Sequence, residues 1–371
     1  MVFGSLVIGL VESSAAICCR LLPDAVIWHP NLALALNNWN ALASQADEEV
    51  GGYRTVGPKL NLEFSSGSAC GSAFGDSYVI GTDVGYNEGW VEQLSHLLGC
   101  RVTNYAVGNY GTDQAYLHFR RVQDNAPFVI LGINPNTVAD NVNQYDALLG
   151  SELMPTALKG RFLLDPSGRL EWLPLPHIDG DGFVELNENP SKILSKSYFL
   201  PGTRDGPVTL SFPYSLALAR IALMPRFQRL LLRKAVWTDL YAPDHPSGAL
   251  KLMIAICEAF ADLAKVRGQR PLIVILPLAD SFREKANYGE FEFASLVLAL
   301  QKDGIEVFDP GKAMIDSLAG RSPCELYTHA HPAATWLLSP VPCGGHYSVL
   351  ANTTLAQLVA TELRQRNLVN K

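Results

Sequence analysis

Residues 71–78 read GSAFGDSY, a short apolar run that ends in a glycine turn. From residue 71 onward, short apolar runs alternate with helical segments, which is typical of a parallel sheet with crossover helices. Such runs cover residues 72–74, 101–106, 128–131, 272–276 and 306–308. The sequence therefore predicts an α/β fold. The loops after its strands would share one edge of the sheet, where ligands bind in open α/β proteins.

The other segments predict how the chain is organised around this sheet. Helical patterns cover residues 88–98, 112–122, 247–266, 291–301 and 350–364. We expect residues 1–22 to form a membrane anchor or a capping helix, 23–70 an extended lead-in arm, and 71–371 the main domain with an insertion at about 150–245. Residues 1–22 lack the basic start and the clear cleavage site of a signal peptide.

The insertion has two recognisable patterns. A turn at residues 166–168 separates two strand-like runs and predicts a β-hairpin. Residues 214–232 predict a helix that breaks at Pro225 and has Arg and Lys residues along its end. This basic, apolar helix either contacts a membrane surface or a partner, or packs as an ordinary insertion helix with a solvated edge.

Composition narrows the class of protein. The 371 residues include 29 Lys plus Arg and 36 Asp plus Glu, so the net charge of −7 lacks the basic excess that nucleic-acid binding needs. An apolar share of 48% and a charged share of 18% indicate a folded globular protein. Seven cysteines are few and odd in number, which does not indicate a disulfide framework and leaves the compartment open.

A serine follows the first predicted strand. Gly75 permits a tight turn at the strand end, so Ser77 would project at the carboxyl edge of the sheet. A serine at this place can be a nucleophile if a base reaches it. Gly-Asp-Ser is equally an ordinary turn sequence. Val79 stands where the Gly-x-Ser-x-Gly elbow of α/β-hydrolases has its second glycine, which argues against that fold.

The next two loops carry candidate donors for an oxyanion. Gly108 and Asn109 lie just ahead of a predicted helix, where backbone N–H groups are able to face a developing negative charge. The loop after the third strand contains Asn134 and Asn136, and a side-chain amide there is a suitable donor. Each loop taken alone is also consistent with a plain strand-to-helix connection.

A histidine lies near the carboxyl terminus, in CGGHYS at residues 343–348. His346 on this glycine-containing loop would reach across the sheet edge to Ser77 and accept its proton, because imidazole titrates near neutral pH. The alternative is a purely structural histidine.

The order and placement of these four pieces resemble the SGNH (GDSL-like) hydrolase superfamily over about residues 71–365. Residues 75–77, 104–114, 132–136 and 346–348 look like its first, second, third and last blocks. The resemblance implies a flavodoxin-like three-layer α/β domain in which Ser77 is the nucleophile and His346 its base. It also implies an oxyanion site made by the Ser77 N–H, the N–H near Gly108 and Asn109, and the Asn136 amide, with no metal or organic cofactor.

The sequence departs from the superfamily at the acid, which usually precedes the histidine by three residues. That position is Cys343 here. Because a neutral thiol cannot orient an imidazolium, we expect a backbone carbonyl or a distant acid, Asp309 or Glu325, to do so, or activity to be low. A further departure is Thr137, which stands where an Asp often follows the third-block Asn.

The expected function is hydrolysis of a carboxylic ester through an acyl-enzyme, and the resemblance alone suggests a carbohydrate O-acetyl ester. The alternatives are an O-acyltransferase of the same fold and a non-catalytic carbohydrate-binding or assembly protein with a degenerate site. A less favoured alternative is a zinc site of His329, His331, Cys343 and His346. We expect a small-molecule or carbohydrate ester as partner and no nucleic acid. The location would be the cell envelope if residues 1–22 are an anchor, and the cytoplasm otherwise.

Overall fold

The computed structural model describes residues 2–22, 26–28, 45–54, 57–64, 68–150, 157–330 and 343–369. The chain divides into two compact units, each built from three separate segments. Unit 1 consists of Met1–Gly52, Val142–Arg161 and Pro174–Val236. Unit 2 consists of Tyr53–Asn141, Phe162–Leu173 and Trp237–Lys371. Of the predicted extended arm of residues 23–70, the structure describes half, namely residues 26–28, 45–54, 57–64 and 68–70.

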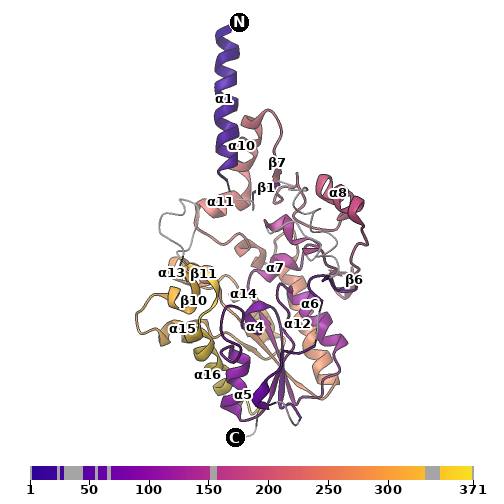
Figure 1. Ribbon diagram of the computed structural model, residues 1–371, viewed down its shortest axis with the longest axis vertical. Coiled ribbons are helices and arrows are strands. Elements are labelled where there is room, and N and C mark those ends of the chain that lie inside the picture. Colours follow the sequence, from indigo (N-terminus) through magenta and orange to yellow (C-terminus); the bar gives the residue numbers. More distant parts are fainter. Residues whose placement is uncertain are drawn as a thin grey trace. The chain divides into compact units, whose positions relative to one another are not determined.

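The core of unit 2 is a five-stranded parallel sheet (Figure 1). Its strands are β2 (Gly71–Phe74), β3 (Val102–Asn104), β4 (Phe128–Ile133), β8 (Arg270–Ile275) and β9 (Val307–Phe308). Every residue of β2, β3 and β4 is buried, as expected of strands covered on both faces. All five predicted strands are therefore present, and the α/β prediction is confirmed.

The strand order is β3-β2-β4-β8-β9. The chain moves from β2 outward to β3 and then returns past β2 to β4, so the direction of winding reverses at β2. In open α/β sheets, such a reversal leaves a crevice at the carboxyl ends of the strands, and ligands bind there. The loop that carries Ser77 follows β2 and lies at this place.

The helices of unit 2 cover the sheet on both sides. Helix α5 (Trp90–Leu98) packs against α16 (Val349–Gln365), and α6 (Thr112–Arg121) packs against α12 (Ala249–Val266) (Figure 1). These four helices and α14 (Ala294–Lys302) match the five predicted helices to within three residues at each end. Further helical segments are α4 (Ser77–Ile80), α7 (Thr137–Asp140), α13 (Ala279–Tyr288), α15 (Gly311–Ser317), and the 3-10 turns η1 (Leu62–Phe64), η4 (Thr238–Tyr241) and η5 (Pro323–Leu326).

Two small sheets accompany the main one. β5 (Arg161–Leu164) and β6 (Leu170–Leu173) form the predicted hairpin. β10 (Tyr327–Ala330) and β11 (Cys343–Tyr347) pair antiparallel, and β11 carries the candidate base His346.

Unit 1 joins the amino-terminal segment to most of the insertion. Its helices are α1 (Val2–Arg20), α8 (Gly180–Glu188), α9 (Pro190–Ile193), α10 (Tyr214–Leu223) and α11 (Pro225–Leu231), with the turn η2 (Asp146–Leu149). Strand β1 (Ile27–Trp28) pairs parallel with β7 (Val208–Thr209). The predicted break at Pro225 is confirmed, since α10 ends at Leu223 and Pro225 opens α11. Within the described residues, no helix has the length and apolarity that a membrane span requires.

Four of the seven cysteines form disulfides, which corrects the expectation from the sequence. Cys70 pairs with Cys100 beside the first residues of β2 and β3, at a Cα separation of 5.9 Å. Cys324 pairs with Cys343 and ties η5 to β11, at a Cα separation of 5.4 Å. An odd number of cysteines does not reveal which of them approach closely enough to pair, because that depends on the fold.

Candidate active site

Ser77 is the first residue of α4, and the turn of Gly75 and Asp76 separates it from β2. The turn between them requires glycine at residue 75, where φ is +154°. A Cβ there would lie 2.4 Å from Val79 Cγ2 and 2.9 Å from the carbonyl oxygen of Gly132. Asp76 caps the helix by accepting a hydrogen bond from the Tyr78 N–H at 2.9 Å. The turn therefore holds Ser77 at the carboxyl edge of the sheet, half-buried.

The carboxylate of Asp83, which was not among the acids expected from the sequence, contacts His346. Oδ2 of Asp83 is 2.9 Å from His346 Nδ1, and the same oxygen accepts hydrogen bonds from the Thr328 hydroxyl at 3.2 Å and the His346 N–H at 3.4 Å. The hydrogen bond from the His346 side chain lowers the pKa of Asp83 below its usual value. The ring of His346 thus has one nitrogen held by an ionised carboxylate, which leaves Nε2 for chemistry.

Tyr78 joins the serine helix to the histidine strand. Its hydroxyl donates to the carbonyl oxygen of Gly345 at 2.7 Å. Its ring lies 5.0 Å from the ring of His346 and 4.9 Å from that of Tyr347, measured between centroids. Because Tyr78 directly follows Ser77, these contacts bring the serine turn and His346 to the same part of unit 2.

The structure records no hydrogen bond between Ser77 and His346 within the residues it describes. Ser77 Oγ has no partner among them, so its proton is not yet shared with the imidazole. Hydrogen bonds of this kind are often long in the absence of substrate and shorten when it binds.

Neither acid expected from the sequence contacts His346. Asp309 accepts a hydrogen bond from the Gly311 N–H at 2.8 Å, at the start of α15. Glu325 forms an ion pair with Arg321 at 2.5 Å. Asp83 contacts His346 in their place, because the loop after α4 passes beside β11. Asp83 follows Ser77 by six residues in the sequence, and this spacing does not reveal that Asp83 lies close to His346.

The disulfide removes Cys343 from the zinc alternative. A sulfur bonded to Cys324 cannot act as a thiolate ligand. His331 lies outside the described residues, and the part of the chain that is described holds no cluster of three or more His, Cys, Asp or Glu suited to a metal ion.

The structure distinguishes the two asparagines of the third loop. The side-chain amide of Asn134 donates to Oδ2 of Asp76 at 2.6 Å and is therefore engaged. The side-chain oxygen of Asn136 has no hydrogen-bond partner among the described residues, and no hydrogen bond uses its amide nitrogen. Asn136 is thus the one of the two whose amide is available to a ligand.

Backbone contacts hold the loop of Gly108 and Asn109 beside the serine turn. The Val107 N–H donates to the carbonyl oxygen of Gly75 at 3.1 Å. The Gly108 N–H, next in the chain, has no acceptor among the described residues, and Asn109 adopts a left-handed conformation with φ of +63°. Gly108 therefore offers a backbone donor near Ser77, whose own N–H begins α4.

Thr137 connects the second and third loops of the candidate site. Thr137 donates its hydroxyl to the carbonyl oxygen of Asn134 at 2.7 Å and lies 2.8 Å from the Thr112 hydroxyl. These contacts connect α7 to the first residue of α6. They stabilise the relative positions of the second and third loops.

Asp76 is a buried carboxyl directly beside Ser77. Burial raises its pKa to about 7, although its backbone hydrogen bonds oppose the shift. A carboxyl group with a strongly shifted pKa, in a loop at the sheet edge, is characteristic of functional sites. Its contact with Asn134 makes it a group that positions the third loop.

Comparisons with known proteins leave the family open. No family model matches the chain, and no curated protein matches it. Among solved structures, one crystal structure is similar to this chain with 14% sequence identity and a TM-score of 0.37, covering 80% of this chain and 97% of its own. The resemblance to the SGNH superfamily therefore stays a prediction, and the function is argued from the site alone.

Proposed function

We propose that unit 2 is a serine esterase of the SGNH type, with a flavodoxin-like domain and a Ser77–His346–Asp83 triad. The observation that carries this proposal is the 2.9 Å contact between Asp83 Oδ2 and His346 Nδ1. The alternative of a degenerate, non-catalytic site was based on Cys343, which stands where an acid usually precedes the histidine. Asp83 supplies a carboxylate from another part of the chain. The strand order, with its reversal at β2, supports the same fold.

In the proposed reaction, Ser77 Oγ attacks the ester carbonyl while His346 Nε2 accepts the hydroxyl proton. The carbonyl oxygen becomes an oxyanion, for which the Ser77 N–H, the Gly108 N–H and the Asn136 amide are the proposed donors. Collapse breaks the bond to the alcohol, which leaves with the proton from His346. Water, deprotonated by His346, then attacks the acyl-enzyme and releases the acid and Ser77.

The disulfides bear on where this reaction takes place. Disulfides persist in oxidising compartments and are rare in the reducing cytoplasm. Cys70–Cys100 and Cys324–Cys343 therefore favour the cell envelope over the cytoplasm. The carbohydrate O-acetyl ester is part of the proposal on the strength of the resemblance alone.

The decisive test is Ser77→Ala. We expect hydrolysis of p-nitrophenyl acetate to fall by about 10³-fold or more, because the nucleophile is lost. A fluorophosphonate probe should label Ser77 in the natural protein. Ser167→Ala, in the exposed turn between β5 and β6, is the matched control and should keep full activity.

Turnover in water without an added sugar acceptor distinguishes a hydrolase from an acyltransferase. Equal rates for the natural protein and Ser77→Ala, or labelling at another serine, would contradict the proposal.

A further inference from the structure

Helix α1 exposes a row of large apolar side chains. Val7, Ile8, Leu10, Val11 and Ile17 are between 44% and 62% exposed. Residues 7, 10, 11 and 17 recur at spacings of three, four and seven, so they share one face of the helix. A contiguous apolar surface of this kind marks a site of interaction.

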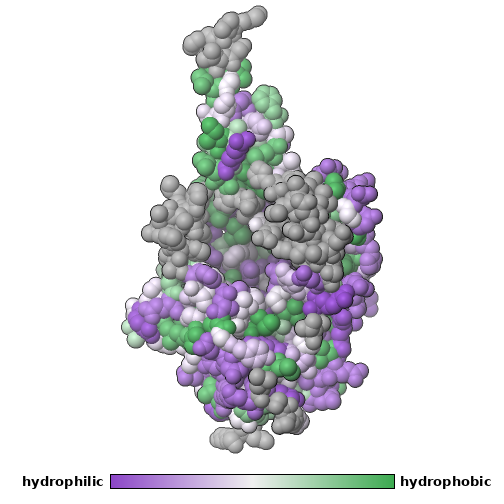
Figure 2. Space-filling view, in the orientation of Figure 1, coloured by the Kyte–Doolittle hydropathy of each residue, from purple (hydrophilic) through white to green (hydrophobic). Residues whose placement is uncertain are grey.

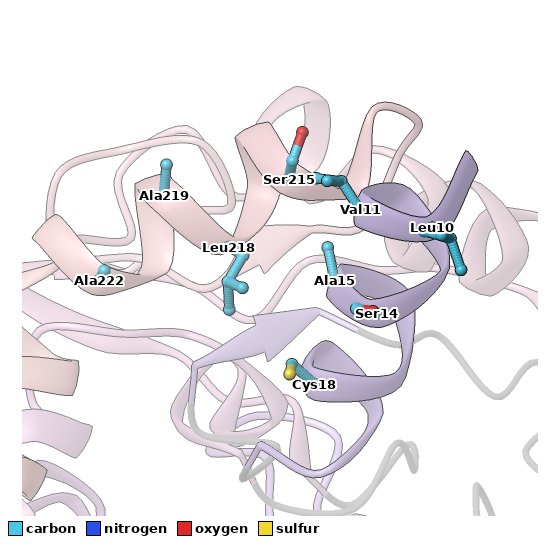
Figure 3. Close-up of a pocket in the computed structure, with 9 residues that line it drawn as sticks. All are labelled: Leu10, Val11, Ser14, Ala15, Cys18, Ser215, Leu218, Ala219 and Ala222. Carbon is cyan, nitrogen blue, oxygen red and sulfur yellow. The ribbon is translucent and has the colours of Figure 1, made fainter. Parts of the chain in front are cut away.

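Helix α10 lies beside α1 in unit 1 and extends this surface (Figure 1). Leu216 and Leu223 are 49% and 76% exposed, and Phe212, just ahead of the helix, is 71% exposed. Figure 2 shows hydrophobic residues gathered over both helices. A groove of about 560 Å³ runs between them, and mainly apolar side chains such as Ala15 and Leu218 line it (Figure 3).

The two helices run in the same direction. Glu12 of α1 meets Ser215 in the first turn of α10, and Cys19 near the end of α1 shares a buried cluster with Ile221 and Met224 at the end of α10. The last turns of both helices therefore lie at the same end of the pair. That end is basic, since Arg20 and Arg220 lie in these turns. The opposite end consists of residues 2–11 of α1, which are uncharged and span about 15 Å, half of a bilayer's hydrocarbon core.

The one charged residue among residues 1–19 is directed toward the partner helix. Glu12 accepts hydrogen bonds from the Ser215 hydroxyl and from the Ser215 N–H, the latter at 3.2 Å. A carboxylate without such partners is costly in an apolar medium. The pair therefore satisfies its one carboxylate internally, and the part of the pair ahead of Arg20 and Arg220 has no other charged side chain.

The charge of the segment around α10 and α11 indicates which kind of partner this surface binds. Residues 206–238 contain five basic residues and no acidic one, in a chain whose net charge is −7. Arg226 and Arg229 are buried, so the basic surface of this segment comes from Arg220, Arg233 and the half-buried Lys234. Arg20, Arg220 and Arg233 are exposed. Basic side chains beside exposed leucines complement anionic lipid headgroups and acyl chains, whereas a neutral apolar partner would make no use of the charge.

We propose that the α1–α10 pair binds an anionic lipid bilayer. Its uncharged residues enter the acyl region, and Arg20 and Arg220 lie at the level of the phosphates. This inference is independent of the proposed esterase activity.

The test is co-sedimentation of the full-length protein with vesicles. We expect binding to phosphatidylcholine vesicles that contain phosphatidylglycerol and binding at least about tenfold weaker to phosphatidylcholine alone. Leu10→Asp with Ile17→Asp should abolish binding. Arg20→Glu with Arg220→Glu should weaken binding to the anionic vesicles by about tenfold or more.

The matched control is Val266→Asp with Leu298→Asp, two positions of unit 2 that are 84% and 66% exposed and should leave binding unchanged. Circular dichroism of each variant verifies folding. Equal binding to both vesicle types would overturn the anionic assignment. The proposal as a whole would be overturned if the folded natural protein bound neither kind of vesicle. It would also be overturned if the protein bound no lipid but formed concentration-dependent dimers that Leu10→Asp abolishes.

Discussion

Asp83 orients His346 from a loop rather than from the position three residues ahead of the histidine. Its φ of +69° is in the left-handed region, where Asn and Asp are the side chains most readily tolerated after glycine. Asp83→Asn therefore keeps both the shape and the backbone conformation of the loop. It removes only the charge that stabilises an imidazolium.

We expect Asp83→Asn to lower kcat for p-nitrophenyl acetate by about 10²-fold or more, with little change in KM. The effect on stability should be small, since the Asp83 side chain is 31% exposed. Glu325→Gln is the control, because that carboxylate pairs with Arg321 and does not contact His346. A kcat for Asp83→Asn equal to that of the control would show that His346 is oriented by another group.

At the scale of elements, the hairpin of β10 and β11 determines where His346 lies. Tyr327 and Tyr347 both donate their hydroxyls to the carbonyl oxygen of Pro277, at 2.9 Å and 2.8 Å, which fixes the hairpin to the loop after β8. The Cys324–Cys343 disulfide ties the first residue of β11 to η5. Gly345 allows the strand to pass close to its partner, since φ is +76° and a Cβ would lie 2.0 Å from His329 Nδ1.

We predict that loss of this disulfide displaces His346, the proposed base. The double variant Cys324→Ser, Cys343→Ser should lower kcat by about 10- to 100-fold, because small misplacements of a catalytic group are costly. The control is Cys70→Ser with Cys100→Ser, at the amino ends of β2 and β3 and so at the edge of the sheet away from Ser77. That pair should lower the melting temperature and leave kcat near its natural value. Equal kcat losses in the two double variants would contradict a specific role for Cys324–Cys343.

At the scale of the whole molecule, two buried carboxyls link stability to pH. Burial raises the pKa of Asp76 and of Glu292 to about 7. These folded-state values lie above those of an unfolded chain, near 4, so the native state holds both protons more tightly. Their contribution to stability is complete below about pH 4 and is lost as the pH rises toward 7.

The unfolding free energy contributed by these two groups should therefore fall by several kcal/mol, about 3 to 4 for each group, between about pH 4 and 8. Asp76→Asn and Glu292→Gln should each make the decline shallower, and the double variant should make it shallower still. Urea unfolding at a series of pH values measures the slope, with Glu325→Gln as the exposed control. If the unfolding free energy of both single variants declined with pH as steeply as that of the natural protein, the two buried carboxyls would not be the cause of the decline.

The sequence by itself determined where along the chain the five strands of the central sheet and helices α5, α6, α12, α14 and α16 lie, the break at Pro225, and the placement of Ser77 just after the first strand. Those features depend on the spacing of apolar residues and on glycine or proline at turns, which are local properties. Only the tertiary structure decided that Asp83 meets His346, that Cys343 pairs with Cys324, and that Asn134 rather than Asn136 is engaged. Asp83 and His346 are 263 residues apart, and their contact follows from how α4 and β11 pack together, which local patterns do not encode.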